Sequence, residues 1–265
     1  MTFSRFSQPH PKADCDAMQA NCCCQLVAWF IVSYLWHGLG ITLGYHRLLA
    51  HRSLVLPTWV AYSVVIGGYL ALQGSPVVWV GVHRLHHAKS DAPGDPHSPQ
   101  DGFLHALAGW MFKMHNLQTN KELQFLARDV MRDPVYKWLG TRHTADHVVK
   151  CLLFSVAFRA TILLVFGPLA MAANLLAAIL VFCNAQLINA VCHIRLFGAY
   201  RSFPTREHSF NSWLLGIFAL GEGWHNNHHA MPKVARHGRR PLEVDATWYA
   251  ILLLEALGIA KRVQR

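Results

Sequence analysis

The chain has 265 residues, of which 53% are hydrophobic and only 14% are charged, and its mean hydropathy is +0.22. This composition favours a membrane protein over a soluble one. The formal net charge of +10 is compatible with nucleic-acid binding, but the basic residues lie mostly beside long apolar runs, where anionic lipid headgroups would meet them. We therefore expect one membrane-embedded domain over residues 1–265, with membrane lipid and not nucleic acid as its partner.

The first apolar run predicts a membrane span. Residues 1–21 before it are polar and lack the apolar core of a signal peptide, so they predict a flexible tail. Residues 24–44 are uncharged, and these 21 residues match the ~20 that a helix needs to cross a bilayer. His37 lies within this run, and we expect it to be buried and hydrogen-bonded rather than a metal ligand.

The second uncharged run, residues 54–82, predicts a segment that enters the membrane and returns. Its 29 residues are too few for two crossings of ~20 residues each, while one crossing would put His46 and His83 on opposite sides. If the two histidines share a metal site, the segment must be re-entrant or interfacial, with a break near residues 67–68 or 74–76.

Residues 151–189 predict two further spans. They carry a single charge, Arg159, and a Gly-Pro pair divides them. The crossings should therefore cover about residues 151–166 and 169–188, with a tight turn between them. Arg159 must face protein or water within the membrane, and an ion or a carbonyl group is its expected structural partner.

The regions outside these runs predict the side on which the histidines lie. Residues 101–150 predict a polar helical cap, and residues 248–259 predict one interfacial helix. Of the 24 Lys and Arg residues, all but Arg5, Lys12 and Arg159 fall on the histidine side of the spans, which the positive-inside rule places in the cytosol. The expected fold is all-α, with multi-pass transmembrane helices and a cytosolic helical cap, in the endoplasmic reticulum or a bacterial inner membrane.

The histidines are spaced in a way that indicates a metal site. Two triplets share the spacing i, i+3, i+4, which places three imidazoles on one face of a helix. About 0.08 such triplets are expected by chance among 18 histidines in 265 residues. His46 and His51 are spaced i, i+5, which a straight α-helix would splay by about 140°, so a helix end or a turn must re-aim one of them. Asn189 and His193, four residues apart, share a further helical face. The triplets are His83, His86 and His87, and His225, His228 and His229.

The number of imidazoles limits the kind of metal site. The two triplets together with His46, His51 and His193 supply nine imidazoles. This number suits two transition-metal ions with four or five ligands each. A structural zinc ion would need only four ligands. Imidazole alone does not choose among zinc, copper and iron.

The motifs resemble, in order and spacing, those of the membrane-bound fatty acyl desaturases of the Δ9, stearoyl-CoA desaturase-like group. The matching stretches begin at His46, His83, Asn189 and Gly221 and read HRLLAHRS, HRLHH, NAVCH and GEGWHNNHH. The likeness extends over about residues 38–258. It implies an oxidoreductase with a non-haem centre of two Fe ions, which uses O2 and two external electrons to introduce a cis double bond into a saturated acyl chain.

The resemblance also implies roles for individual residues. Asn189 would hold a metal-bound water. The nine implied iron ligands are His46, His51, His83, His86, His87, His193, His225, His228 and His229.

Other residues have more than one interpretation. Glu222 and Asp95 are candidates for orienting ligand imidazoles, although as solvated loop acids they would have no such role. A tunnel for the acyl chain would be lined by Trp79, Trp110 and Trp213, for which ordinary core or interfacial packing is an equal interpretation. The remaining histidines have no partner at ligand spacing and are expected at the surface: His97, His105, His115, His143, His147, His208 and His237.

Absent motifs bear on the electron source and the acyl carrier. No haem-binding His-Pro-Gly-Gly, cluster-type cysteine spacing or G-x-G-x-x-G is present, so electrons should come from a separate carrier of the cytochrome b5 or ferredoxin type. Acyl-CoA members of the family usually carry Arg-Asp before the second histidine motif and Trp before the asparagine. This chain has Gly81, Val82 and Gln186 there, which favours an acyl-lipid, or a loosely held acyl-CoA. The family usually has two spans before the first motif, whereas this chain shows one.

Two other functions are compatible with these motifs. A histidine-box di-iron hydroxylase or ketolase would share the metal chemistry but add oxygen to the substrate, and its products would distinguish it. A metal transporter or metal sensor would need polar residues along the spans to carry ions, and residues 24–44 and 165–187 contain few.

Overall fold

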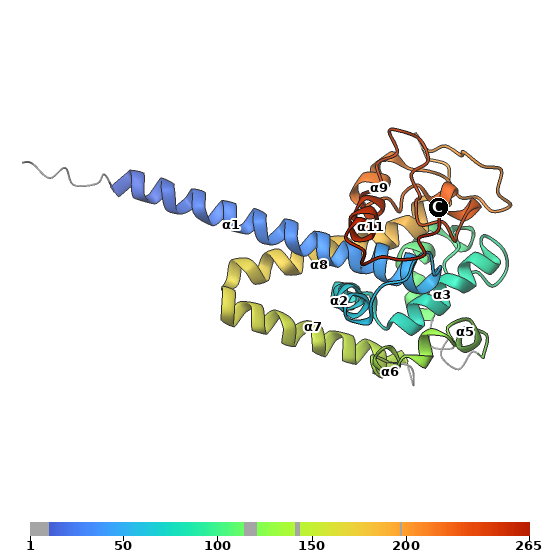
Figure 1. The fold of residues 1–265 in the computed structure, drawn as a ribbon, viewed down its shortest axis with the longest axis horizontal. Coiled ribbons are helices and arrows are strands. Elements are labelled where there is room, and N and C mark those ends of the chain that lie inside the picture. The colour runs from blue at the N-terminus through green and yellow to red at the C-terminus, as the bar shows by residue number, and fades with distance from the viewer. Residues whose placement is uncertain (1–10, 114–120, 141–143, 197) are drawn as a thin grey trace, which may run out of the picture.

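The computed structural model describes residues 11–113, 121–140, 144–196 and 198–265 (Figure 1). Within them the chain is helical, and its β structure is limited to three isolated bridges. The all-α expectation is therefore confirmed. Of the expected tail, residues 1–10 lie outside the described part, while α1 (Pro11–Leu39) already begins at Pro11.

Long apolar helices form an arm of the molecule, which we define as α1, η1, α7 and α8. α1 continues into η1 (Gly40–Ala50). α7 (Thr144–Phe166) turns at Gly167 into α8 (Pro168–Val191), and Figure 1 shows α8 running back between α7 and α1. Gly167 has a φ of 87°, which glycine adopts without steric cost, so it provides the tight turn predicted at the Gly-Pro pair.

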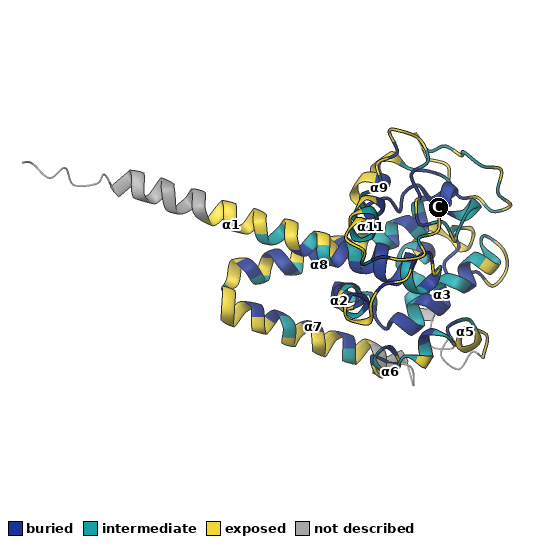
Figure 2. Cartoon of the chain, in the orientation of Figure 1, coloured by how far each residue is buried: buried dark blue, intermediate teal, exposed yellow. Residues whose placement is uncertain are grey.

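The arm has the length and surface of membrane-spanning helices. Figure 2 shows much of α7 as exposed. Many large apolar residues of the arm are among the exposed ones, and Leu164 on α7 is 85% exposed. Water would disfavour such a surface, whereas lipid would not. Among the described residues, three helices are long and apolar enough to cross a membrane: Cys22–Ala50, Val148–Phe166 and Pro168–Val191.

A broken helix follows the first arm helix. α2 (Thr58–Gly68) continues through η2 (Tyr69–Gln73), and α3 (Pro76–Lys89) follows at an angle of 78°. The break falls at residues 74–75, the second of the two places that the sequence indicated. Ser75 accepts from the Val77 backbone N–H and so caps the start of α3.

Side chains of neighbouring elements bond the carbonyl groups that the break frees. Arg159 on α7 donates from Nη2 to Leu70 O at 3.0 Å and from Nη1 to Ser155 O at 3.1 Å. The Tyr45 hydroxyl of η1 donates to Gly74 O at 2.8 Å. Backbone groups without partners are costly away from water, so these bonds allow the helix to break there. Arg159 thus has carbonyl partners, one of the two kinds that the sequence predicted.

The crossing of η1 over α2 depends on glycine. A Cβ at Gly40 would lie 2.0 Å from the Gly68 nitrogen, so any side chain would force the two backbones apart. Beside this crossing His37 donates from Nδ1 to Gly67 O at 2.8 Å, and Asn174 Nδ2 donates to His37 Nε2 at 3.1 Å. His37 is therefore buried and hydrogen-bonded, as predicted.

The described residues of 90–140 and 192–265 form a cap at one end of the arm (Figure 1). Arg84 on α3 joins the cap to η1, because it donates to Ala50 O at 2.8 Å and to Asp129 Oδ1 at 2.6 Å. Burial would raise the pKa of Asp129, but Arg84 and Arg52 outweigh it and lower that pKa to about 2. The cap helices are η3 (Pro99–Asp101), η4 (His105–Gly109), α4 (Trp110–Lys113), α5 (Lys121–Leu126), η6 (Val130–Arg132), α6 (Pro134–Trp138), α9 (Trp213–Phe218), α10 (His225–Ala230) and α11 (Ala246–Ala256).

α11 occupies most of the stretch predicted as an interfacial helix. Trp248 and Ile251 on one side are buried in a cluster with Leu43 of η1. Tyr249 and Leu253 on the other side are exposed. A short helix with a buried face and an exposed apolar face suits the plane of a membrane surface.

Candidate metal centre

His46 and His51 are aimed at one point by a π-helical turn. The His51 backbone N–H donates to His46 O at 3.0 Å, the i+5 to i bond that defines a π-helix. Because each turn is wider than in an α-helix, residues i and i+5 lie nearly above one another, and the two ring centroids are 4.8 Å apart. The re-aiming that the spacing required is therefore a widened helical turn within η1.

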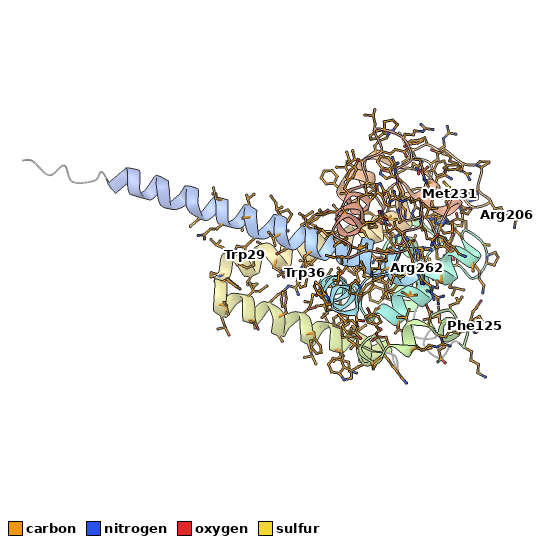
Figure 3. All side chains as sticks on the ribbon, in the orientation of Figure 1. Trp29, Trp36, Phe125, Arg206, Met231 and Arg262 are labelled. Carbon is orange, nitrogen blue, oxygen red and sulfur yellow. The ribbon has the colours of Figure 1, made fainter. Side chains whose placement is uncertain are left out.

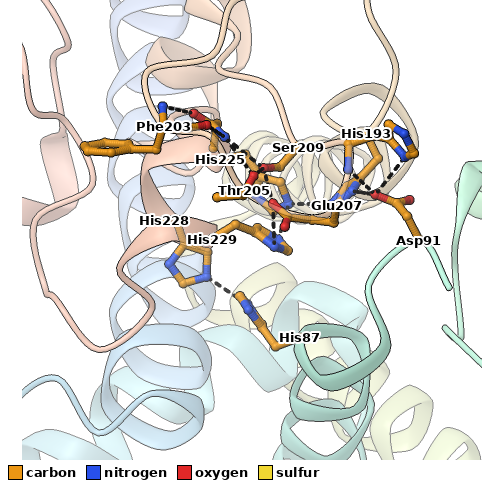
Figure 4. A network of polar contacts seen from close by, with 12 residues as sticks. His87, Asp91, His193, Phe203, Thr205, Glu207, Ser209, His225, His228 and His229 are labelled. Carbon is orange, nitrogen blue, oxygen red and sulfur yellow. Dashed lines mark hydrogen bonds and ion pairs between the residues drawn. The ribbon is translucent and has the colours of Figure 1, made fainter.

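The two histidine triplets lie on separate helices that face each other: α3, which adjoins the cap, and α10, which belongs to it. α3 carries the first triplet in its last turns, and α10 begins at His225 and carries the second. His193 follows the end of α8, directly after the capping residue Cys192. Figure 4 shows the side chain of His87 pointing from α3 toward His228 on α10.

The nine predicted histidines lie in two groups. Within each group one ring nitrogen per residue lies within 4.8 Å of all the others. The five-histidine group consists of His46, His51, His83, His87 and His228. The four-histidine group consists of His86, His193, His225 and His229. Each group thus has the number of imidazoles that one transition-metal ion accepts.

Neighbouring nitrogens in both groups have the spacing of ligands around one ion. His228 Nε2 lies 3.0 Å from His46 Nε2 and 2.9 Å from His87 Nε2, and two such distances in the four-histidine group are 2.9 and 3.1 Å. Adjacent ligands with metal–nitrogen bonds of about 2.0–2.1 Å are separated by roughly 3 Å. His86 Nε2 is buried without a hydrogen-bond partner, and a metal ion would satisfy it. The residues present therefore fit a pair of metal ions.

Burial keeps the imidazoles of the second triplet in the neutral form that a metal binds. It lowers the pKa values of His225, His228 and His229 well below the usual value, and the neighbouring rings add to the effect. A neutral ring nitrogen carries the lone pair that a metal ion needs. At physiological pH a proton would not compete for these three side chains.

Carboxylates contact the ring nitrogens that point away from the two groups. His46 Nδ1 lies 2.5 Å from Glu222 Oε2, and His86 donates from Nδ1 to Asp95 Oδ1 at 2.9 Å. Such contacts fix the tautomer and orientation of an imidazole. Both carboxylates are buried, so they are not the solvated loop acids of the alternative interpretation.

A third carboxylate, that of Asp91, also contacts a histidine of the centre, and the sequence did not predict it. It accepts from His193 Nδ1 at 2.8 Å and from the His208 backbone N–H at 2.8 Å (Figure 4). Asp91 has a φ of 57°, which is uncommon for a residue with a side chain and is found often at functional sites. Its only signal in the sequence is its position in the loop that follows His87, because no spacing rule connects it to His193.

Two histidines expected at the surface are buried beside the groups. The ring of His97 lies 4.3 Å from that of His86, and the ring of His237 lies 4.5 Å from that of His228. Burial lowers the pKa of His97 to about 3 and that of His237 well below the usual value. The expectation was wrong because loops, and not helical spacing, bring both side chains there.

The other histidines without ligand spacing differ in exposure. His208 is exposed, as expected, and His105 is half-buried. His115 and His143 lie outside the described residues, as does the side chain of His147.

An apolar cavity of about 190 Å³ adjoins both groups. Trp79 and Trp110, two of the three tryptophans expected around an acyl chain, line it. Trp213 does not; its ring packs 5.1 Å from that of Trp224. Asn189 also lines the cavity, as do histidines of both groups. A hydrocarbon chain held in this cavity would lie directly beside the two groups.

Comparison with known proteins assigns this chain to a family. A model of the fatty acid desaturase family matches residues 24–252. The chain is 36% identical over 236 residues to the sn-1 stearoyl-lipid 9-desaturase of Anabaena variabilis, covering 88% of this chain and 82% of that protein. It is 39% identical over 237 residues to the sn-2 palmitoyl-lipid 9-desaturase of Nostoc sp. (strain 36), covering 87% and 78%. It is 37% identical over 227 residues to the acyl-CoA 5-desaturase of Anemone leveillei, covering 85% and 67%.

The chain belongs to the fatty acid desaturase family. It is an oxidoreductase that desaturates fatty acyl chains, and the resemblance seen in the histidine motifs is confirmed. The hydroxylase or ketolase and the metal transporter or sensor are not favoured.

Proposed function

We propose that this chain introduces a cis double bond at Δ9 into acyl chains of membrane lipids. It would use O2, two iron ions, and electrons from a separate carrier of the cytochrome b5 or ferredoxin type. The observation that carries the proposal is the division of nine imidazoles into groups of five and four beside one apolar cavity. The names of the relatives, stearoyl-lipid and palmitoyl-lipid 9-desaturase, support the lipid substrate and the position of the double bond.

The side chains of the protein act in this reaction by position. The bound ions would supply the oxidising chemistry that unactivated methylenes require, because no acid, base or nucleophile can remove their hydrogens. The apolar lining excludes water and holds a saturated chain beside the histidine groups. Glu222 and Asp95 hold His46 and His86 in one tautomer and orientation. Asn189 lies in the cavity wall, where it would hold a metal-bound water.

A lipid carrier is favoured because the position of the family's Arg-Asp pair is closed here. Gly81 and Val82 are buried, and a Cβ at Gly81 would lie 3.3 Å from Leu123 O. Gln186 accepts from the Trp110 indole N–H at 3.1 Å. Neither position presents a cation to the phosphates of CoA. A loosely held acyl-CoA is the second candidate, supported by the name of the Anemone leveillei relative.

For the membrane arrangement we propose three spans, formed by α1 with η1, by α7 and by α8, as predicted at about residues 24–44, 151–166 and 169–188. The segment α2–η2–α3 would enter the membrane and return on the cap side. Basic residues such as Arg206 and Arg262 lie on the cap, whereas Trp29 and Trp36 lie on the arm (Figure 3). By the positive-inside rule this distribution favours a cytosolic metal centre, in the endoplasmic reticulum or a bacterial inner membrane.

Fatty acid analysis after expression tests the proposal. The full chain, His228→Ala and His208→Ala would be expressed in a host that lacks Δ9 unsaturates, and the fatty acids profiled by gas chromatography and mass spectrometry. The full chain should form Δ9 cis-monoenes. His228→Ala should form none although it stays in the membrane, while His208→Ala, exposed and outside both groups, should match the unchanged chain. Hydroxylated products, or active protein with stoichiometric zinc and no iron, would refute the proposal.

A further inference from the structure

A buried arginine lies directly behind the five-histidine group. Arg47 is 0% exposed, and its Nη2 donates to Asp245 Oδ1 at 2.9 Å and to Glu222 Oε1 at 3.2 Å. The other oxygen of Glu222 lies 2.5 Å from His46 Nδ1. A continuous chain of polar contacts therefore runs from Asp245 through Arg47 and Glu222 to His46.

Asp245 is held rigidly at the outer end of this chain. Its carboxylate accepts from the backbone N–H of His237 at 2.8 Å and from that of Trp248, in the first turn of α11, at 2.9 Å. A Cβ at Gly221 would lie 2.3 Å from Asp245 Oδ1, so only a glycine beside Glu222 leaves room for the carboxylate. Asp245 cannot shift without disturbing the end of α11 and the segment that carries Glu222.

The charges along this chain depend on one another. One guanidinium serves two carboxylates, all three buried, where charge-assisted hydrogen bonds are strong. With Asp245 present, Arg47 divides its positive charge between the two. Without the charge of Asp245, Arg47 would act on Glu222 alone, and Glu222 would become a weaker acceptor for the His46 Nδ1–H. A weaker acceptor behind an imidazole makes that imidazole a weaker metal ligand.

We propose that Asp245 and Arg47 are positioning residues for the metal ion of the five-histidine group. They fix the orientation of Glu222 and its strength as an acceptor, and through Glu222 the strength of His46 as a ligand. The inference rests on the proposed function, because it requires an ion in each group. The four-histidine group has its own carboxylates, Asp91 and Asp95, so the effect should be confined to one of the two ions.

The test compares two carboxylate variants of the full chain, purified in detergent and loaded with iron-57. Asp245→Asn should release one of its two irons to a ferrous chelator about tenfold faster than the unchanged chain. This factor is the lower end of the effect typical of residues beside a metal ligand. It should change only one of two Mössbauer signals. Asp91→Asn, which acts on His193, should accelerate release of the other iron and change the other signal. General loosening of the protein would affect both irons in both variants, and that result would overturn the inference.

Two further variants complete the test. Arg47→Lys offers one compact charge in place of a planar fork and cannot serve both carboxylates in the same way, so it should change the same Mössbauer signal as Asp245→Asn. Glu243→Gln is the matched control, because Glu243 is equally buried in the same segment but bonds Asn227 instead of Arg47. Release from Glu243→Gln should equal that of the unchanged chain, and faster release of the same iron would overturn the inference. An unchanged chain that binds no iron in either group would refute the proposed function itself.

Discussion

His51 donates its backbone N–H to the carbonyl of His46, five residues earlier, at 3.0 Å. This bond belongs to a π-helical turn, and the turn brings the two rings to a centroid distance of 4.8 Å. The spacing of the first histidine motif and the local winding of η1 therefore depend on each other. Two side chains reach one group because the helix accommodates one more residue per turn there.

Insertion of one alanine after Leu49 should disrupt this relationship. His51 would move to i+6 from His46, so the two imidazoles could no longer share the five-histidine group. Iron content, measured by mass spectrometry on purified protein, should fall from about two to about one per chain, since the ligands of the four-histidine group lie elsewhere. Leu49→Ala, which shortens a partly buried side chain but keeps the spacing, should retain both irons. Two irons in the insertion variant would contradict the role of the π-turn.

The proposed topology places the two ends of the chain on opposite sides of the membrane. An odd number of spans separates the start of α1 from the cap, and Figure 1 shows these at opposite ends of the arm. Tags at both termini, tested with protease in sealed inside-out vesicles, should give a cleaved C-terminal tag and a protected N-terminal tag. Detergent should expose both tags. Equal cleavage of both without detergent would show an even number of spans.

The acyl carrier can be compared directly with purified enzyme. We expect turnover of saturated phospholipid or glycolipid with its electron carrier, and weaker turnover of stearoyl-CoA, because Gly81 and Val82 present no cation or carboxylate to the CoA head group. A low-affinity reaction with the CoA ester should weaken further as salt is raised, because only long-range attraction would support it. Saturable turnover of stearoyl-CoA with none of the lipid would contradict this prediction.

Asp129, which accepts from Arg84 on α3 and from Arg52, should contribute to the stability of the folded chain. Asp129→Asn weakens charge-assisted bonds to Arg84 and Arg52, and we expect a loss of about 1.5–3 kcal/mol, seen as a lower midpoint in thermal unfolding. Glu122→Gln, in the exposed pair with Lys89, should cost about 0–1 kcal/mol. Equal shifts of the unfolding midpoint in the two variants would show that the Asp129 contacts stabilise the fold no more than an exposed ion pair does.

The same contacts predict a direction for the pH dependence of stability. The pKa of Asp129 in the folded chain, about 2, lies below the value of roughly 3.9 for an unfolded aspartate. Its contribution should therefore be complete above about pH 4 and be lost as the pH falls toward 2. Unfolding of the unchanged chain and Asp129→Asn across this window should converge at the acid end.

Patterns local in the sequence predicted much of the fold and the site. Uncharged runs of membrane length indicated the arm, a Gly-Pro pair indicated the turn at Gly167, and the histidine triplets indicated which helical faces carry ligands. These succeed because helix periodicity and bilayer thickness act over about 20 residues. The division into groups of five and four could not be predicted, because each triplet divides its members between both groups.

The residues that the sequence missed are those that long-range contacts bring to the site. His97 and His237 have no partner at ligand spacing, and Asp91 is separated by 102 positions from His193, which donates to it. On a helix, the spacing of residues along the sequence determines the direction of each side chain. The position of a loop residue or of a buried ion pair depends instead on how segments far apart in the sequence pack together.

The sequence by itself determined the helices that are apolar enough to cross a membrane and the faces that carry a multi-histidine centre, because composition and spacing alone specify apolar length and helical face. Only the tertiary structure decided which histidines meet, how the π-turn of η1 aims His46 and His51, and which carboxylates stand behind the imidazoles. Those features depend on residues far apart in the chain, such as Arg47 and Asp245, whose contact spans 198 positions. Packing removes both side chains from water, and each charge then needs the other, because an unpaired buried charge is costly.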